Sequence, residues 1–220
     1  MTADSDISGA LGKGQTFDGS LDYISFGQTG LSAGYDERTL SLWTKMNSIA
    51  SLFHHAASYG SPSNGNAMFI GAKDDILLGG GYGGTLGYDL ELNDFWNITE
   101  PKHLALTYDG SIAKLYEGET ELISQTQNWN LVKNKAYIGR LVNDSDYWNG
   151  WVDEVRISSV VRSSAWISVE HQNQSSPNDF YTISAGLQLV GSGDGGNTNP
   201  LSITISGLTL GETYSFTATA

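Results

Sequence analysis

The chain has 220 residues, with 27 glycines, 11 tyrosines and 6 tryptophans, a composition suited to short strands and many turns. Eleven basic against 24 acidic residues give a net charge of −13, which argues against nucleic-acid and anionic-membrane partners because both need basic patches. The absence of cysteine excludes disulfides, thiolate metal sites and a cysteine nucleophile. No stretch has the apolar length of a membrane span, so no membrane insertion is expected, and residues 1–16 lack the apolar core of a signal peptide.

Short strand-like stretches separated by turn residues fill residues 1–183, which predicts an antiparallel sandwich rather than a parallel α/β sheet. The run at 39–44 alternates cleanly, with Leu40 and Leu42 on one face and Trp43 on the other. Asp109-Gly110, after an apolar run, is a strong hairpin signal. The other predicted strands lie at residues 17–19, 23–26, 67–70, 76–78, 104–108, 113–116 and 136–139.

Residues 163–173 predict one short helix that closes the sandwich, with Ser163 as its cap. The stretch 185–200 is rich in glycine, serine and asparagine, which predicts a flexible linker after a sandwich over residues 1–184. Residues 201–220 then contain a C-terminal pair of strand-like runs, which cannot form an independent core. They predict either a fragment of a following β domain or strands added to the main sheet.

The segment 149–157 is the most informative one. Read as a strand, it places Trp151, Asp153, Val155 and Ile157 on one face, which is apolar apart from the carboxylate. Burying an unpaired carboxylate is expensive. The pattern therefore predicts that Asp153 points toward the core and has backbone donors, a cationic side chain or a metal as its partner.

The order of several motifs resembles a laminin-G-like jelly roll of the concanavalin A-like lectin/glucanase superfamily. These motifs are Phe17-Asp18-Gly19, the strand at 39–43, the segment 102–110, the strand at 136–140 and the segment 150–157, followed by a closing segment at 162–181. The resemblance covers about residues 8–183 and implies an all-β fold of two curved antiparallel sheets, one with a concave face. The tail at 205–220 resembles part of a fibronectin type III-like repeat.

The resemblance also implies a function: a non-catalytic recognition or adhesion module outside a bacterial cell, beside other domains of a larger polypeptide. Its expected partner is a glycan, bound with calcium present, or a cell-surface or extracellular protein. Two alternatives stay open, a structural spacer or protein-binding domain of an adhesin and a divergent glycoside hydrolase. The nearest approach to a paired-carboxylate array is Asp89-Leu90-Glu91, which lacks a second glutamate, so no enzymatic activity is expected.

Calcium is the cofactor that the resemblance implies. Relatives hold a structural calcium near their first and last strands, and by motif Asp153 and Asp18 match that place. Two carboxylates plus carbonyls and waters could supply the roughly 6–8 oxygen ligands that calcium takes. The alternative is that Asp153 accepts backbone hydrogen bonds and that Asp18 only makes the turn at Gly19.

Carbohydrate binding would need exposed aromatic faces beside polar groups. Six aromatic residues lie in stretches rich in glycine, asparagine and aspartate rather than in clean strands, namely Tyr82, Tyr88, Trp96, Trp129, Tyr147 and Trp148. Asp144 and Asp146 add a polar loop at 143–146, just before Trp148. The alternative is that these large rings pack in the core, as they more often do in a sandwich. The histidines at 54, 55, 103 and 171 are interpreted as packing or solvated residues rather than metal ligands.

Overall fold

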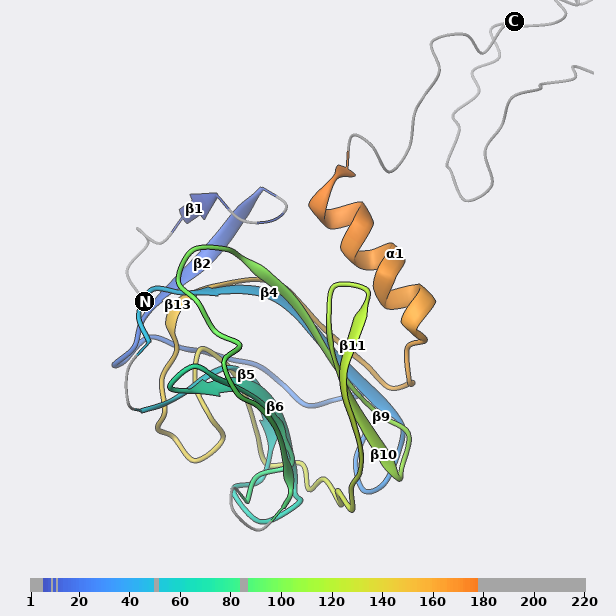
Figure 1. Ribbon diagram of the computed structural model, residues 1–220. Coiled ribbons are helices and arrows are strands. Elements are labelled where there is room, and N and C mark those ends of the chain that lie inside the picture. Colours follow the sequence, from blue (N-terminus) through green and yellow to red (C-terminus); the bar gives the residue numbers. More distant parts are fainter. Residues whose placement is uncertain (1–5, 9, 11, 50–51, 84–86, 178–220) are drawn as a thin grey trace, which may run out of the picture. The chain divides into compact units, whose positions relative to one another are not determined.

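A computed structural model describes residues 6–8, 10, 12–49, 52–83 and 87–177 (Figure 1). The first of the two units into which the chain divides ends at Pro177. The predicted linker at 185–200 and the predicted strand pair in 201–220 lie outside the described residues, so both stay predictions. Among the described residues, no helix is long and apolar enough to cross a membrane.

Two antiparallel sheets form a sandwich, which confirms the predicted all-β jelly-roll fold. The seven-stranded sheet has the order β1 (Asp6–Ser8), β2 (Lys13–Asp18), β13 (Asn149–Ser158), β4 (Arg38–Met46), β9 (Lys102–Tyr108), β10 (Ile112–Glu117) and β11 (Thr120–Thr126). The six-stranded sheet has the order β3 (Ile24–Ser25), β12 (Lys135–Ile138), β5 (Phe53–Gly60), β6 (Ala67–Lys73), β7 (Ile76–Gly80) and β8 (Asp89–Leu92). Figure 1 shows both sheets curved in the same sense, with the six-stranded sheet inside the curve.

The turn between β9 and β10 shows how local chemistry sets the strand register. Asp109 Oδ1 accepts hydrogen bonds from the backbone N–H groups of Ser111 and Ile112, at 2.8 and 2.6 Å. Gly110 has a φ of 97°, which a residue with a side chain rarely adopts. The predicted hairpin at Asp109-Gly110 is therefore confirmed, with Ala113 paired to Tyr108 directly after the turn.

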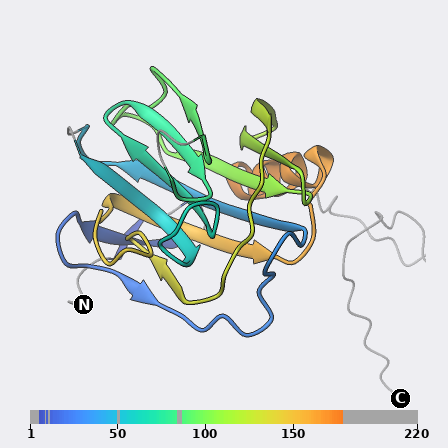
Figure 2. The same cartoon turned by 90° about the horizontal axis from the view of Figure 1, so that it is seen from below.

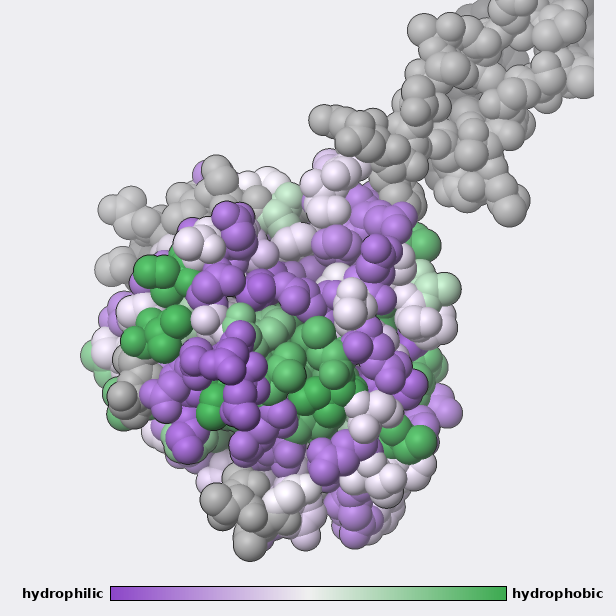
Figure 3. Space-filling model, in the orientation of Figure 1, coloured by the Kyte–Doolittle hydropathy of each residue, from purple (hydrophilic) through white to green (hydrophobic). Residues whose placement is uncertain are grey.

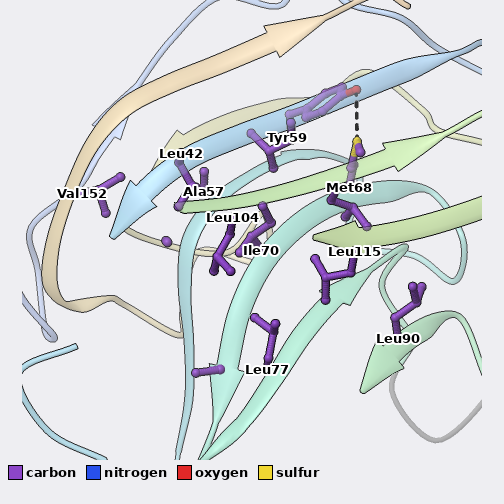
Figure 4. Close-up of a cluster of buried hydrophobic side chains, with 14 of the residues drawn as sticks. Leu42, Ala57, Tyr59, Met68, Ile70, Leu77, Leu90, Leu104, Leu115 and Val152 are labelled. Atoms are coloured by element: carbon purple, nitrogen blue, oxygen red, sulfur yellow. Dashed lines mark hydrogen bonds between the residues drawn. The ribbon is translucent and has the colours of Figure 1, made fainter. Parts of the chain in front are cut away.

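The core fills the space between the sheets (Figure 4). Leucines such as Leu42 and Leu104 enter it from the seven-stranded sheet, while Met68 and Ile70 enter it from the six-stranded sheet. The Tyr59 hydroxyl lies 3.7 Å from the sulfur of Met68, so the buried hydroxyl has a partner. The large apolar side chains buried on both sheets are the main source of stability for a domain without disulfides.

The predicted facing of the segment 149–157 is wrong for its first half, because the strand contains a β-bulge. The pairing of β13 with β4 shifts register between Asp153 and Arg156, where Glu154 has a φ of 50°. Val152 is buried in the core, and after the bulge Val155 again packs against the core. The carboxylate of Asp153 therefore lies on the opposite face from Val152, and its Oδ1 accepts a hydrogen bond from the Glu154 N–H at 2.8 Å.

The predicted closing helix is confirmed as α1 (Ser164–Ser175). Ser163 caps it, accepting a hydrogen bond from the Trp166 N–H at 3.2 Å. The helix lies against the outer, convex face of the seven-stranded sheet, where Ile167 packs with Ala105 and Tyr116 (Figure 1). The helix does not extend over the outer face of the six-stranded sheet.

Candidate functional site

The outer face of the six-stranded sheet is the concave face of the molecule's sandwich (Figure 1). Along β6, Met68 and Ile70 point into the core, so the alternate residues Phe69 and Gly71 point to the concave side. A row of paired residues crosses the sheet from Phe69 through Gly80 to Asp89 on the edge strand β8. Aromatic, glycine and acidic residues therefore lie side by side on this face.

Gly71 and Gly80 leave a shallow depression on the concave face of the sheet, which forms the floor of the site. A Cβ at Gly71 would lie 2.7 Å from Cδ2 of His55, and a Cβ at Gly80 would lie 2.5 Å from Cζ of Phe69 and collide with the Asp89 carboxylate. Real Cβ atoms are not found so close to other heavy atoms. The absent side chains let the rings of His55 and Phe69 lie down on the sheet, with centroids 4.6 Å apart in an edge-to-face contact.

The loop between β12 and β13 turns back over this face, as Figures 1 and 2 both show. The Asp146 carbonyl accepts a hydrogen bond from the His55 N–H at 3.1 Å, which fixes the loop to β5. Asp144 and Asp146 have φ values of 68° and 59°, in the left-handed region that aspartate tolerates better than most residues. Inside the loop the Asn143 side-chain amide donates to Asp146 Oδ2 at 3.0 Å.

Floor and loop together enclose a pocket of about 330 Å³, at the lower end of the range for small-ligand sites. Its walls combine aromatic and aliphatic side chains with amides and carboxylates. The lining residues are Phe53, His55, Asn64, Phe69, Leu78, Tyr82, Gly83, Asp89, Leu141, Asn143 and Asp146. Asp89 is held in place because its Oδ1 accepts a hydrogen bond from the Tyr82 N–H at 3.1 Å.

His55 is the buried polar group of the pocket, with 2% of its surface exposed. Burial and the neighbouring His54 lower the pKa of His55 to about 3, so the ring is neutral at pH 7. Its Nδ1 atom has no hydrogen-bond partner among the described residues. A neutral imidazole contributes a polar edge to the pocket and no positive charge.

A second cluster lies on the other side of the same loop. The Arg140 guanidinium lies 3.6 Å from the ring centroid of Tyr23 and 4.0 Å from that of Tyr137. Its Nη2 is 3.0 Å from Asp144 Oδ1, and Asp144 also pairs with Lys135. The hydrogen bond from Lys135 is the main cause that holds the pKa of Asp144 below its usual range. The charges of this cluster are thus satisfied within it.

Comparison with known proteins identifies the family. The family model described as the concanavalin A-like lectin/glucanases superfamily matches residues 18–168. The chain belongs to this superfamily. No curated protein matches the chain.

Solved structures share the fold of this concanavalin A-like domain. The CBM40 module of the Ruminococcus gnavus IT-sialidase, bound to α2,3-sialyllactose, is 14% identical with a TM-score of 0.55, over 71% of this chain and 95% of that one. Domain 4 of an extracellular arabinanase from Geobacillus stearothermophilus, in complex with arabinotriose, is 20% identical with a TM-score of 0.55, over 74% and 78%. Trypanosoma rangeli sialidase matches at 12% identity and a TM-score of 0.56, over 76% of this chain and 28% of that one. These likenesses show the fold.

The structure divides the residues predicted to bind a ligand. Tyr82 and Asp146 line the pocket of this concanavalin A-like domain, whereas Asp144 lies in the cluster around Arg140. Tyr88 is half-buried against the core. Tyr147 contacts Tyr23 on the Arg140 side of the loop, with ring centroids 6.4 Å apart.

The expected exposure of the three tryptophans is wrong. Trp129 and Trp148 are 0% exposed and Trp96 is 4% exposed. Trp129 donates its Nε1–H to the Tyr88 carbonyl at 2.7 Å, and Trp96 packs edge-on against Trp148 with centroids 5.5 Å apart. All three rings belong to the core between the sheets, so they have no free face for a sugar.

The carboxylates of Asp18 and Asp153 do not fit the predicted shared calcium ion. Asp18 pairs with Asn149, four residues before Asp153 on β13, which separates the two by about 13 Å at about 3.3 Å per residue. Calcium ligands lie within about 2.6 Å of the ion. Asp18 instead closes a turn, accepting hydrogen bonds from the Ser20 hydroxyl and from the backbone N–H groups of Ser20 and Leu21.

The Ser20 hydroxyl, followed by these backbone groups, holds the pKa of Asp18 well below its usual range. Within the described part of the chain, no three histidine, aspartate or glutamate residues form a group that could hold a metal ion. Calcium binding by this chain stays a prediction, and it has no support from these two residues.

Several pocket residues were not predicted from the sequence. Phe69 carried a usable signal, because it lies in the strand between Met68 and Ile70, whose side chains both point into the core. His55, Asn64 and Leu141 had none, since they meet only when the loop between β12 and β13 folds back over β5.

Proposed function

We propose that this chain is a non-catalytic carbohydrate-binding module of an extracellular protein, and that a glycan binds in the pocket on the concave face. The observation that carries the proposal is the composition of that pocket. Aromatic rings of Phe53 and Tyr82 lie next to the amides of Asn64 and Asn143 and the carboxylate of Asp146. Sugars offer apolar ring faces for such rings and hydroxyl groups for such amides and carboxylates.

The shape of the site also suits this function. The pocket is open to solvent, and its floor is a sheet rather than a mobile segment. Rigid, partly preformed sites lose less free energy in ordering on binding. Figure 3 shows an apolar area surrounded by hydrophilic side chains on the face seen there, so apolar surface of this domain is accessible as well as buried.

The fold shared with sugar-bound modules supports the proposal. The Ruminococcus gnavus CBM40 module is bound to a sialylated trisaccharide, and the Geobacillus stearothermophilus arabinanase domain is in complex with arabinotriose. Both are modules of sugar-processing enzymes with the same sandwich. A module of this kind acts beside the other domains of a larger polypeptide, which fits the proposed extracellular location.

The test is a glycan array followed by isothermal titration with the best-binding oligosaccharide. Tyr82→Ala removes an aromatic wall of the pocket, and Asn64→Ala removes an exposed amide at its mouth. Each should weaken binding at least fivefold. Tyr35→Ala is the matched control, because Tyr35 is 50% exposed and lies by the β9–β10 turn. Binding that is lost equally in the control, or not lost in either pocket variant, would refute this location.

The two alternatives give different results in the same experiments. A spacer or protein-binding domain would bind no oligosaccharide on the array. A divergent glycoside hydrolase would release shorter products from the bound glycan. Asp89 and Glu91 share the outer face of β8, but only Asp89 lines the pocket, so this carboxylate pair does not face one bound sugar. We therefore expect chromatography to recover the glycan intact.

A further inference from the structure

We propose that the concave pocket selects neutral glycans and rejects sugars that carry a carboxylate or sulfate. This inference rests on the proposed function, and it names the class of ligand. The charged groups that line the pocket distinguish this domain from a module that binds sialic acid. The inference rests on the lining of the pocket, which among the described residues contains two carboxylates and no cationic side chain.

Asp89 and Asp146 both line the pocket, and each contributes a carboxylate to its wall. No lysine or arginine lines it among the residues that the structure describes. All eleven lysines and arginines of the chain lie within the described residues. Residues 84–86, which lie outside the described residues, include no charged residue in the sequence. An acidic sugar would therefore meet like charge without a compensating cation.

The remaining polar groups do not change this balance. The His55 ring is buried and neutral at pH 7 because its pKa is lowered to about 3. The side-chain amides of Asn64 and Asn143 are uncharged and offer both donors and acceptors. The carboxylates accept hydrogen bonds from hydroxyl groups, which neutral sugars supply around the whole ring.

Three cationic side chains lie near the pocket without lining it. Arg140 and Lys135 lie on the other side of the β12–β13 loop, where both pair with Asp144. Lys73 is at the rim, with its Nζ 5.4 Å from the ring centroid of Phe53 on the side of the sheet that forms the pocket. One exposed, hydrated lysine at a rim attracts anions weakly at physiological ionic strength.

The experiment uses an array of matched pairs, in which each neutral oligosaccharide is printed beside the same chain carrying sialic acid, a uronic acid or sulfate. Isothermal titration then measures the best pair at low and physiological salt. We expect the neutral member of each pair to bind at least tenfold more tightly than the acidic member. This affinity difference should be larger at low salt, because salt screens the repulsion between the acidic sugar and the pocket carboxylates. An acidic member that binds equally or more tightly overturns the inference and leaves the proposed function standing. If no glycan of either kind binds, the proposed function itself fails.

Charge variants locate the selectivity. Asp89→Asn together with Asp146→Asn removes both pocket charges, and asparagine keeps an acceptor oxygen and tolerates the positive φ at position 146. This double variant should lower the ratio of neutral-glycan affinity to acidic-glycan affinity at least threefold. The control variant Glu117→Gln with Glu119→Gln also removes two carboxylates, but at the β10–β11 turn beside α1. It should leave the ratio of neutral-glycan to acidic-glycan affinity unchanged. An equal fall of this affinity ratio in both double variants would overturn the inference.

Lys73→Gln checks the rim. Because the neutral glycan contacts the pocket rather than the ammonium group, its affinity should stay within twofold of wild type. Acidic-glycan binding by the wild type that disappears in this variant would show that the rim lysine recruits anions, which would also overturn the inference.

Discussion

Gly80→Ala tests whether the glycine floor shapes the pocket. Gly80 is in β7, on the concave face between Phe69 and Asp89. Its backbone is one that any residue can adopt, so the change adds only a methyl group. That methyl would lie 2.5 Å from Cζ of Phe69 and collide with the carboxylate of Asp89. The Asp89 side chain must turn away, and its hydrogen bond from the Tyr82 N–H is then lost.

The magnitude follows from these contacts. Overpacking a fitted site costs about 1–3 kcal/mol. The lost hydrogen bond to a half-exposed carboxylate adds about 1 kcal/mol. The reduced chain entropy of the unfolded state returns about 0.4–1 kcal/mol for a Gly→Ala change. We therefore expect Gly80→Ala to lower the free energy of unfolding by about 2 kcal/mol, which corresponds to a fall in Tm of roughly 4–8 °C for a chain of this size.

Urea unfolding monitored by tryptophan fluorescence measures this loss, and titration with the best neutral glycan measures the pocket. Gly27→Ala is the matched control, because Gly27 also lacks a positive φ and a Cβ there would meet no described atom within 4 Å. It should be neutral or stabilising by up to about 1 kcal/mol. If Gly80→Ala unfolds at the same urea concentration as Gly27→Ala and binds glycan as wild type does, the account of the floor is wrong.

Two further predictions concern charged groups away from the pocket. Burial alone would raise the pKa of Glu170, but its contact with His103 and its hydrogen bond from Arg156 hold the pKa below its usual range. Glu170→Gln should therefore cost about 1–3 kcal/mol at pH 7 by urea unfolding, with the difference shrinking as the pH falls below the unfolded-state value of about 4.3, and an undiminished difference at pH 3 would contradict it. Asp18→Ala should destabilise by about 1 kcal/mol through the lost turn, equally in EDTA and in calcium chloride, and a loss seen only with calcium would revive the metal site.

Local patterns account for much of the fold. The alternation around Leu40 and Leu42, and the Asp109-Gly110 turn, each report which residues share a face or where a strand reverses, and the structure confirms both. Such signals depend on neighbours a few residues apart. They are readable from one chain because strand periodicity and turn geometry are themselves local.

The errors come from features that break this locality. A β-bulge at Glu154 moves the side chains that follow it to the opposite face of the strand. No residue at 153–156 indicates this bulge in the sequence, since glutamate with a positive φ is uncommon. Trp129 and Trp148 occur among turn residues, yet both rings are buried in the core. Glycine-rich surroundings thus indicate an irregular backbone and do not say on which side of it a ring lies.

The pocket depends on the loop between β12 and β13, and this loop also explains how it acquires its charge. Arg140 and Asp144 turn to one side, where they pair with each other. Asn143 and Asp146 turn to the other side and line the pocket. Left-handed backbone at positions 144 and 146 makes this division possible, because an extended loop would send alternate residues to fixed faces. The loop therefore keeps its arginine out of the pocket and places the Asp146 carboxylate in it, and the proposed selection against acidic sugars rests on this arrangement.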